Sequence, residues 1–372
     1  MVHTFQGYLR SDGSAGTRNH IGIISSVICS SVVTNEIASK VSGSVPIVHA
    51  NGCAQLGDDF QVTKNMLSGA AENPNFYGAL LVGLGCETNQ VEGLLKAIPK
   101  TKPIEGFGIQ QMAGGRNTVE RGVSTANVWS KEAEEEERQE LPVSLLKIGV
   151  VTEDIDEATL EKVNPVVSGF LNLLITHGAT VIFGLTKTLE PAGDIMASTI
   201  QNDELKNRLI HLHEGLSRRR WEEAKKYKRP EFSRVEKQLA NLEARLLGDN
   251  EIQSLLTYNE KPKRNGLHLI KASGSIVETL SNFASVGCNI SIVISKRGIL
   301  TSSNILPCIT VGPDTYGESS NEFVDYKIGT SQIEQQIQSL FAELLSISSG
   351  KLTQLEEYEL GEFAIPHVGT TF

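Results

Sequence analysis

HIGIISSV, residues 20–27, is a short apolar run rich in β-branched side chains. Such runs are typical of strands that are buried on both faces of a parallel sheet. Three similar runs follow, at residues 46–50 (PIVHA), 79–84 (ALLVGL) and 104–110 (IEGFGIQ). Helix-like stretches separate them, for instance residues 31–41 and 59–71. Strand and helix therefore alternate, which predicts a parallel, doubly wound α/β sheet for the first part of the chain.

The same alternation returns in the second half of the chain. The further predicted strands are residues 146–152, 180–184, 267–271, 290–295 and 309–312. Because 372 residues are many for one hydrophobic core, we expect two domains. Each should be an α/β domain built on a mostly parallel sheet flanked by helices. The expected parts are a first domain at 1–130, an acidic linker at 131–142, and a second domain at 143–372 with a long, charged helical insertion at about 202–259.

Two charged stretches allow more than one interpretation. The run SKEAEEEERQ, residues 130–139, is best explained as a solvated helix end that links the domains. The cluster RRRW, residues 218–221, lies in the charged insertion. Such a cluster can bind an anion or nucleic acid, but on an amphipathic helix it is more often a solvated face.

Composition and the first residues narrow the class of protein. Hydrophobic residues make up 40% and charged residues 21% of the chain, as in an ordinary globular protein. The net charge of −10 disfavours nucleic acid or an anionic membrane as the main partner. Residues 1–8 (MVHTFQGY) do not resemble a signal peptide, and no apolar run is long enough to span a bilayer. We therefore predict a cytoplasmic protein that binds neither nucleic acid nor a membrane.

Two segments place a Gly-Cys pair at the expected end of a strand: HANGCAQLGDD, residues 49–59, and GLGCETNQ, residues 83–90. The carboxyl ends of strands are where α/β proteins bind ligands. The chain has five cysteines, an odd and scattered set that does not suggest a disulfide framework. Thiolates, an imidazole and carboxylates are together the side chains of a metal site. These segments therefore predict a metal-binding or catalytic site at this edge of the first sheet.

Several of these residues also have a structural interpretation. Cys29 ends an apolar strand, where a buried thiol is as reasonable as a ligand. His49 is either a packed histidine or a site residue three positions before Cys53. Asp58 and Asp59 can hold a metal, orient His49 or cap the following helix, and we favour capping for one of them.

Candidate substrate-binding residues also have alternatives. Glu87 and Gln90 follow a strand, so helix capping competes with substrate binding at these positions. Arg18 can pair with a substrate carboxylate or form a salt bridge that anchors the first strand. The stretch GGRN, residues 114–117, can form an anion-binding loop that includes Arg116. Cys288 and Cys308 are interpreted as core residues.

The segments 7–19 (GYLRSDGSAGTRN), 49–53 and 85–90 resemble the altronate and galactarate dehydratase family, which includes the large subunit of (R)-sulfolactate sulfo-lyase. Residues 349–351 (SGK) and 361–366 (GEFAIP) are similar to the family's closing segment. The resemblance implies β-elimination from a sugar acid, with loss of water or sulfite, assisted by a divalent metal. Fe²⁺ is the expected metal, with Mn²⁺ or an iron–sulfur cluster as alternatives. The three N-terminal cysteines match the family's recurrent cysteines, and His49 matches its histidine.

These observations give one predicted site. Its catalytic residues are His49, Asp59 and Glu87, its substrate-binding residues are Arg18, Asn19, Asn89, Gln90 and Arg116, and its metal ligands are Cys53, Cys86 and Cys29. The substrate is expected to be a small anionic hydroxy acid such as altronate or galactarate. The site should lie between the two domains, at the carboxyl ends of the first-domain strands.

The second half departs from the family pattern. VTEDID, residues 151–156, stands where the family has a Cys-Gly-Gly-Ser-Asp loop, and the family's Asn-Pro-Ser-Pro-Gly-Asn segment has no counterpart. Glu153, Asp154 or Asp156 can replace sulfur with oxygen and favour a harder metal, or can simply begin the next helix. Full-length family members begin with a small domain that this chain lacks. The resemblance therefore implies a separate small partner subunit and an oligomer.

Three hypotheses follow from the sequence. The chain is a metal-dependent lyase subunit acting on a hydroxy acid, a catalytically degenerate homologue that binds a small anion, or a redox or iron–sulfur protein. We favour the first, with a sulfolactate sulfo-lyase-type large subunit as its alternative.

Overall fold

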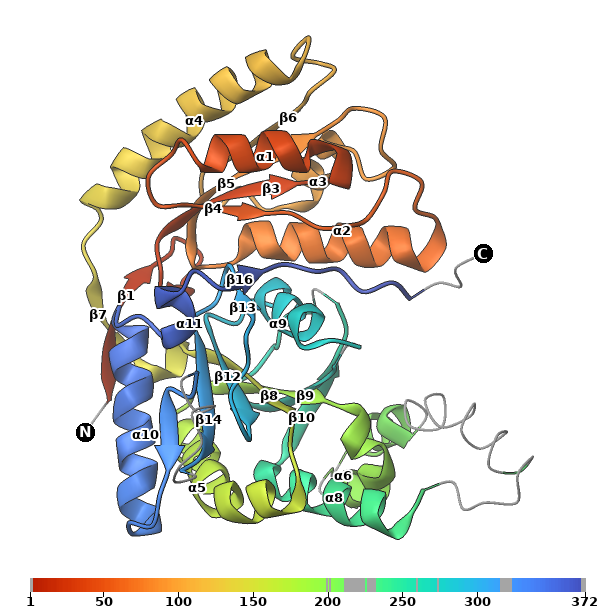
Figure 1. Ribbon diagram of the computed structural model, residues 1–372, viewed down its shortest axis with the longest axis vertical. Coiled ribbons are helices and arrows are strands. Elements are labelled where there is room, and N and C mark those ends of the chain that lie inside the picture. Colours follow the sequence, from red (N-terminus) through yellow and green to blue (C-terminus); the bar gives the residue numbers. More distant parts are fainter. Residues whose placement is uncertain are drawn as a thin grey trace.

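The computed structural model describes residues 3–198, 200, 202–210, 225, 232–258, 260–272, 274–314 and 323–368. In this part of the chain, two parallel sheets lie one above the other in Figure 1, each flanked by helices. The upper sheet has four strands in the order β4-β3-β5-β6, and the lower has seven in the order β10-β11-β9-β8-β12-β14-β15. The predicted α/β class with two mostly parallel sheets is confirmed.

The first sheet is covered by helices on both faces. Its strands are β3 (His20–Ser25), β4 (Ser44–Ile47), β5 (Phe76–Gly83) and β6 (Ile104–Gly108), and its helices are α1 (Ser31–Ala38), α2 (Gly57–Glu72), α3 (Val91–Ala97) and α4 (Gly115–Glu135). Ile21 and Ile23 of β3 pack in one core cluster with residues of α1 and α4. Ile24 belongs to the opposite cluster, which contains residues of α2 and α3. Because both faces are buried, β3 is a continuous apolar run instead of an alternating one.

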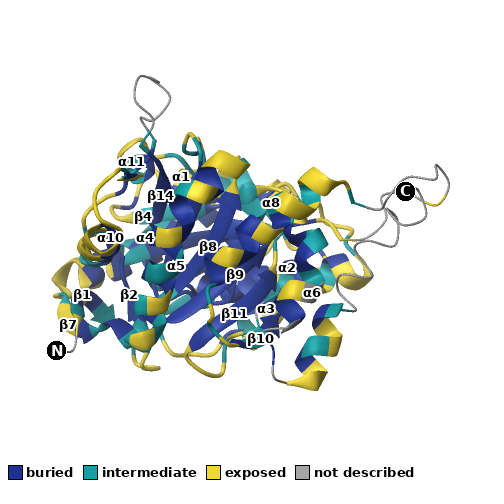
Figure 2. Cartoon of the chain, turned by 90° about the horizontal axis from the view of Figure 1, so that it is seen from below, coloured by how far each residue is buried: buried dark blue, intermediate teal, exposed yellow. Residues whose placement is uncertain are grey.

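The second sheet is built in the same way. Its strands are β8 (Lys147–Glu153), β9 (Thr180–Leu185), β10 (Ile252–Leu256), β11 (Gly266–Lys271), β12 (Ile290–Ser295), β14 (Cys308–Pro313) and β15 (Tyr326–Ile328). Its main helices are α5 (Glu157–Thr176), α9 (Ile276–Ser285) and α10 (Ile333–Ser348). Figure 2 shows its central strands β8 and β9 largely buried beneath these layers, while the outer helix faces are exposed.

The expected helical insertion at 202–259 contains a strand. Residues 203–210 and α8 (Arg234–Ala244) are helical, but β10 follows and pairs in parallel with β11 at the edge of the sheet. Residues 252–256 form a strand because their backbone pairs with β11. Their sequence mixes polar and apolar residues and so lacks the pattern of a buried strand. The arginine cluster at 218–220 and Trp221 lie outside the described residues.

The acidic run is divided between two elements. α4 extends to Glu135, and the chain then enters β7 (Gln139–Pro142). β7 pairs antiparallel with β1 (Thr4–Leu9), which also pairs with the short β2 (Ala15–Gly16). This small sheet joins the N-terminal strand to the connection between the two larger sheets.

The two sheets are held together by α2 and α9, which pack against each other. Asn73, just after α2, donates its Nδ2 hydrogens to the carbonyls of Ala284 at 2.7 Å and Cys288 at 2.8 Å. The C-terminal part adds α11 (Gln354–Glu357) and β16 (Gly361–Glu362), and β16 pairs with β13 (Ser302–Ser303). Beyond β16 the chain runs between α2 and α9 (Figure 1).

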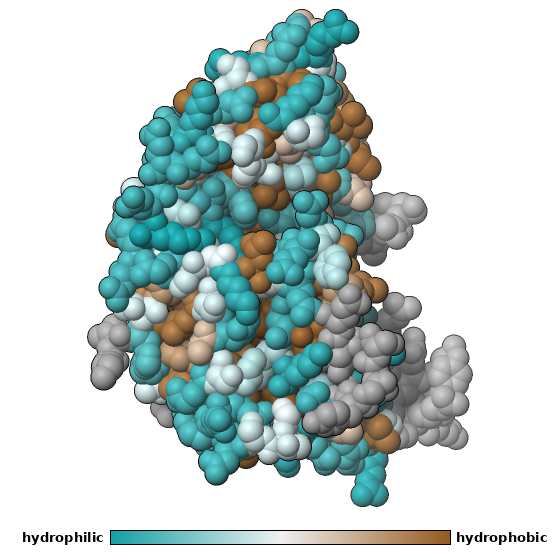
Figure 3. Space-filling model, turned by 60° about the vertical axis from the view of Figure 1, so that its left-hand side comes forward, coloured by the Kyte–Doolittle hydropathy of each residue, from teal (hydrophilic) through white to brown (hydrophobic). Residues whose placement is uncertain are grey.

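Figure 3 shows the polarity of one face of the molecule. The face in Figure 3 is mainly hydrophilic, and its apolar side chains form small separate areas. In the described part of the chain, no helix combines the length and the apolar character that a bilayer span requires.

Candidate active site at the carboxyl edge of the first sheet

The three predicted cysteine ligands all follow strands of the first sheet. Cys29 lies in a 3₁₀ turn (Ile28–Ser30) after β3, Cys53 lies in the loop after β4, and Cys86 follows β5. All three side chains are exposed. Because the strands are parallel and neighbouring, the loops that carry these thiols lie along one edge.

Backbone hydrogen bonds connect these loops to one another. The carbonyl of Asn51 accepts from the amide of Ile28 at 3.0 Å. The carbonyl of Cys53 accepts from both the amide and the hydroxyl of Thr88, each at 3.1 Å. The structure thus brings the segments around Cys29, Cys53 and Cys86 together.

Glu87 holds the turn after β5 in place. Its Oε1 accepts from the hydroxyl of Ser26 at 2.7 Å and from the amide of Leu84 at 3.2 Å, and its Oε2 accepts from the amide of Gly85 at 2.6 Å. Glycine is required at position 83, since a Cβ there would lie 2.2 Å from Glu87 Oε1. Glu87 is buried, so its carboxylate supports the loop that presents Cys86.

His49 lies under the same edge. Its Nδ1 accepts from the amide of Asn51 at 3.2 Å, so the ring proton is on Nε2, which donates to the carbonyl of Ser25 at 3.1 Å. Burial lowers the pKa of His49 to about 4, which keeps the ring neutral. Both ring nitrogens therefore bind backbone groups, one at the end of β3 and the other in the loop after β4.

Asp59 is in the first turn of α2, beside the Cys53 loop, and its side chain meets the C-terminal tail. Its Oδ1 accepts from the amide of Val368 at 2.7 Å and lies 3.2 Å from Nδ1 of His367. Sequence reasoning did not single out His367. The sequence offers only a weak indication that His367 belongs to the site, which is its position directly after the closing segment 361–366.

A cavity of about 620 Å³ adjoins the Cys86 loop. Its lining includes Glu87, Gln90, Gln110 and Gln111, with apolar side chains such as Leu95. Two of the predicted site residues, Glu87 and Gln90, thus reach a real cavity at the ends of β5 and β6.

Two further predicted residues, Asn89 and Arg116, follow strands of the same sheet. Asn89 is buried, and its Nδ2 donates to the carbonyl of Phe60 at 3.2 Å. Arg116 is exposed in the first turn of α4, after β6. The turn before it is unusual, because Ala113 has a φ of 59° and Gly114 one of 125°.

Arg18 and Asn19 lie elsewhere, since they precede β3 and so belong to its amino end. The Nε and Nη2 atoms of Arg18 bind the two carboxylate oxygens of Glu356 at 2.7 and 2.8 Å. Oδ1 of Asn19 accepts from Arg10 at 2.7 Å, and its Nδ2 donates to the carbonyl of Ala133 at 3.0 Å. The structure does not bring these two residues to the cysteines.

The described residues include no group of three or more His, Cys, Asp or Glu side chains arranged to hold a metal ion. Cys29, Cys53 and Cys86 follow neighbouring strands along one edge, but their thiols do not form such a group. The predicted metal stays a prediction.

The second sheet also has a cavity at its carboxyl edge, of about 330 Å³, lined by the ends of β8, β9 and β11 and the start of α9. Here Asp156 caps α5 by accepting from the amide of Thr159 at 2.8 Å, and it pairs with Lys296 at 2.8 Å. Asp154 pairs with Arg297, also at 2.8 Å. Asp156 thus begins the next helix. This is one of the two roles that the sequence left open for the acidic residues of this loop, the other being that of a metal ligand.

Glu243 of α8 lies behind this second cavity. It is completely buried, and its Oε1 accepts from the hydroxyls of Thr152 and Thr186, two residues that line the cavity. Burial raises the pKa of Glu243 to about 7. Sequence reasoning placed no such group in the charged stretch.

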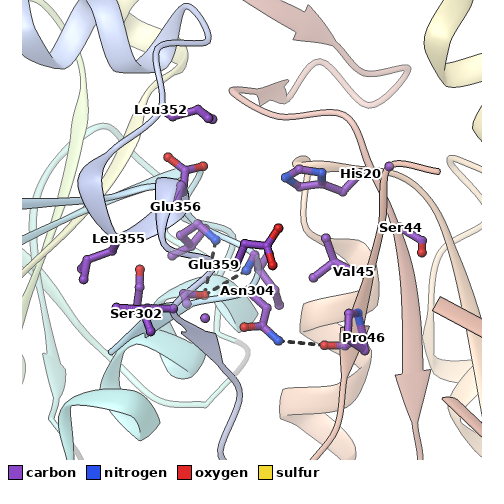
Figure 4. Close-up of a pocket in the computed structure, with 16 residues that line it drawn as sticks. His20, Ser44, Val45, Pro46, Ser302, Asn304, Leu352, Leu355, Glu356 and Glu359 are labelled. Atoms are coloured by element: carbon purple, nitrogen blue, oxygen red, sulfur yellow. Dashed lines mark hydrogen bonds between the residues drawn. The ribbon is translucent and has the colours of Figure 1, made fainter. Parts of the chain in front are cut away.

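A third cavity, of about 540 Å³, opens between the two domains near the amino ends of β3 and β4. Figure 4 shows His20 and Glu356 on opposite sides of it, and Asn304 donating to the carbonyl of Pro46, at 2.8 Å. Burial lowers the pKa of His20 to about 4. This cavity is remote from the thiols, which follow the opposite ends of the strands.

Comparison with known proteins extends over almost the whole chain. It is 25% identical to altronate dehydratase of Bacillus subtilis (strain 168), over 99% of this chain and 78% of that protein. It is 25% identical to (2R)-sulfolactate sulfo-lyase subunit beta of Chromohalobacter salexigens, over 97% of both chains. It is 26% identical to galactarate dehydratase (L-threo-forming) of Escherichia coli (strain K12), over 94% of this chain and 73% of that protein.

Two family models match successive parts of the chain. Residues 7–134 match the second domain of D-galactarate dehydratase/altronate hydrolase, and residues 143–371 match the C-terminal part of D-galactarate/altronate dehydratase. The resemblance drawn from the glycine and cysteine motifs is confirmed. The chain belongs to the D-galactarate and altronate dehydratase family.

Proposed function

We propose that the chain is a lyase subunit that catalyses β-elimination from a small hydroxy acid, with a sugar acid such as altronate or galactarate as the substrate. The observation that carries the proposal is the match of two dehydratase family models, at residues 7–134 and 143–371. The relatives named above are two dehydratases and a sulfo-lyase subunit, and both kinds of enzyme eliminate a group from a carbon chain.

The carboxyl edge of the first sheet has side chains suited to such a substrate. The amides of Gln90, Gln110 and Gln111 line the 620 Å³ cavity and can both donate to and accept from hydroxyl groups. Arg116 starts α4 at the same edge, where its guanidinium can pair with a carboxylate. Removing the proton next to that carboxylate creates additional negative charge, so a cationic or polar environment lowers the barrier.

A divalent metal is part of the proposal, with Fe²⁺ as the first choice and Mn²⁺ as the alternative. When bound, such an ion would stabilise the charge that develops on the substrate oxygens. Cys29, Cys53 and Cys86 are its proposed ligands. Because they do not converge in the structure, no step of the reaction is assigned to the metal.

A separate small partner subunit is also proposed. The chain aligns over 97% of a relative that is itself called subunit beta, and that name implies at least one further subunit in that protein. We propose the same arrangement here, in a cytoplasmic oligomer.

The test begins with protein purified without oxygen, together with any small subunit that copurifies. Its iron, manganese and sulfide are measured, and it is then incubated with altronate, galactarate and (2R)-sulfolactate. A 2-keto acid formed from either sugar acid supports a dehydratase. Release of sulfite supports the sulfo-lyase alternative. No turnover of the three acids by metal-loaded protein contradicts the proposal and favours the degenerate anion-binding homologue.

A variant links the site to the activity. Cys86→Ser should lose metal or turnover, because the serine hydroxyl is a poor replacement for a thiolate ligand. Ser39→Ala, a change in an exposed side chain at the end of α1, is the control and should leave both unchanged. Unchanged metal content and turnover in Cys86→Ser would show that the Cys86 thiol is not part of the site.

A further inference from the structure

The C-terminal tail brings a histidine of the second domain to the edge of the first. Phe363 and Ile365 are buried in the core cluster that contains residues of α2 and α9. The amide of Ala364 donates to the hydroxyl of Ser281 in α9 at 3.0 Å. Figure 1 shows the tail running between α2 and α9 toward the side of the molecule where α2 begins. The tail is therefore anchored along its length, and His367 has a defined position.

The partner of His367 is a carboxylate that is itself held in place. Nδ1 of His367 lies 3.2 Å from Oδ1 of Asp59, and the same oxygen accepts from the amide of Val368 at 2.7 Å. The Asp59 side chain is 10% exposed, whereas that of His367 is 48% exposed. A carboxylate at Nδ1 keeps the proton on that nitrogen and leaves Nε2 as the free acceptor. The exposed part of the ring is thus available to a ligand.

His49, the histidine predicted from sequence, is arranged differently. Its Nδ1 already accepts from the amide of Asn51, and its Nε2 already donates to the carbonyl of Ser25. Taking up a proton on Nδ1 would break the first of these bonds. Burial further opposes the charged ring, as its pKa of about 4 indicates. Of the two histidines, His367 is the one that can accept a proton without disrupting a loop.

The Asp59–His367 pair lies beside the loop that carries the other site residues. The residue after Asp59, Phe60, accepts from Nδ2 of Asn89 at 3.2 Å. Asn89 belongs to the same short loop as Cys86 and Gln90, and Gln90 lines the 620 Å³ cavity. The pair and the cavity thus flank one loop.

We propose that His367, oriented by Asp59, is the base that removes the substrate's α-proton. This inference rests on the proposed lyase function. Nε2 accepts the proton from the carbon next to the carboxylate, and the electron pair of that C–H bond forms the new double bond to the β-carbon. The bond from the β-carbon to its oxygen breaks, and hydroxide leaves with that bonding pair. His367 gives its proton to solvent, which balances the hydroxide as water. The enol then takes a proton from solvent at the β-carbon and releases its hydroxyl proton to solvent, which gives the 2-keto acid.

The test uses the complete protein with any copurifying subunit and whichever acid the wild type converts. His367→Asn keeps an N–H donor for Asp59 but has no atom that can act as the base, and His367→Ala removes both. We expect kcat to fall at least about 100-fold in both variants, within the range typical of a lost general base, with little change in KM. Added imidazole should restore part of the kcat of His367→Ala. Ser39→Ala, a change in an exposed side chain at the end of α1, is the control and should retain wild-type kcat.

Several results would overturn the inference. His367→Asn with kcat close to wild type would show that only the tail's attachment matters. A rise in KM without a fall in kcat would indicate a binding role, and failure of imidazole to restore any activity would argue against proton transfer. If the wild type converts none of the acids, the proposed function fails and the inference fails with it. The assay of the wild type alone distinguishes that outcome from a failure of the inference about His367, in which the wild type is active.

Discussion

Arg18 and Glu356 form a two-point ion pair between residues 338 positions apart in the chain, at 2.7 and 2.8 Å. The other guanidinium hydrogens of Arg18 are also used, by the carbonyls of Thr17, Ile347 and Lys351. Arg18 is 5% exposed. It therefore fastens α11 and the end of α10 to the amino end of β3.

This arrangement predicts that Arg18 acts on stability. Arg18→Ala should lower the free energy of unfolding by about 3–5 kcal/mol, because it leaves a carboxylate and several carbonyls without their partner. Denaturant unfolding followed by circular dichroism measures the change. The control is Lys96→Ala, which breaks the exposed pair with Glu92 and should cost about 0.5 kcal/mol or less. Lost turnover in an Arg18→Ala protein of wild-type stability would instead support the predicted role of Arg18 in substrate binding.

Glu243 predicts a dependence of stability on pH. Its pKa is about 7 in the folded protein, against 4.5 for an ordinary glutamate. Between these values the folded state binds more protons than the unfolded state, so stability falls as pH rises from about 4.5 to 7. The shift corresponds to roughly 3 kcal/mol of the free energy of unfolding. This contribution is lost completely only when the pH exceeds the pKa of Glu243 in the folded protein.

Glu243→Gln tests this dependence, because the amide keeps an oxygen for Thr186 and has no charge to bury. The difference in unfolding free energy between variant and wild type, measured from about pH 4 to 8, should move in favour of the variant as pH rises. Parallel curves for the two proteins would show that Glu243 does not titrate in this window.

The cysteines should divide into two kinetic classes. Cys29, Cys53 and Cys86 are exposed and should react with a thiol reagent in the folded protein. Cys288 and Cys308 are buried, and burial raises the pKa of both thiols, that of Cys308 to about 12. They should react only after denaturation. Mass spectrometry of time points identifies each labelled cysteine, and early labelling of Cys308 would contradict the buried position of β14.

The same experiment examines the proposed metal. If the three exposed thiols bind Fe²⁺, adding that ion without oxygen should slow their labelling and leave the buried pair unaffected. Equal labelling rates with and without the ion would argue that these thiols are not its ligands.

The sheets could be predicted from sequence because both faces of each are covered. The run at residues 290–295 is apolar enough to mark β12, whose bounds are Ile290–Ser295. β10 was missed because IQSLL mixes polar and apolar residues, and only its pairing with β11 makes it a strand. Cys29, Cys53 and Cys86 share an edge for the same reason that the sheet was predictable, since they follow parallel strands.

Other features of the site depend on contacts between residues far apart in sequence. Nothing in the pattern around Arg18 distinguishes a substrate carboxylate from Glu356, and nothing around Asp59 indicates that the tail will reach it. The pairing of His367 with Asp59 requires the packing of both domains against each other. Such contacts depend on tertiary structure and cannot be predicted from the residues next to each partner in the sequence.

Gly83 offers a last prediction about the edge itself. A Cβ at this position would meet Glu87 Oε1 at 2.2 Å and a methyl group of Val91 at 2.7 Å, so Gly83→Ala must displace the Glu87 carboxylate from the turn. We expect a loss of about 1–3 kcal/mol in unfolding free energy, as for other overpacked sites, together with faster labelling of Cys86.

The matched control is Gly93→Ala in α3, where a Cβ meets nothing within 4 Å. Alanine is the better helix former, so this variant should be as stable as the wild type or more stable by up to about 1 kcal/mol. A Gly83→Ala protein that matches Gly93→Ala in stability and in Cys86 labelling would mean that Glu87 does not hold the loop. If the two variants differ as expected, the buried carboxylate fixes the position of the Cys86 thiol through the turn after β5.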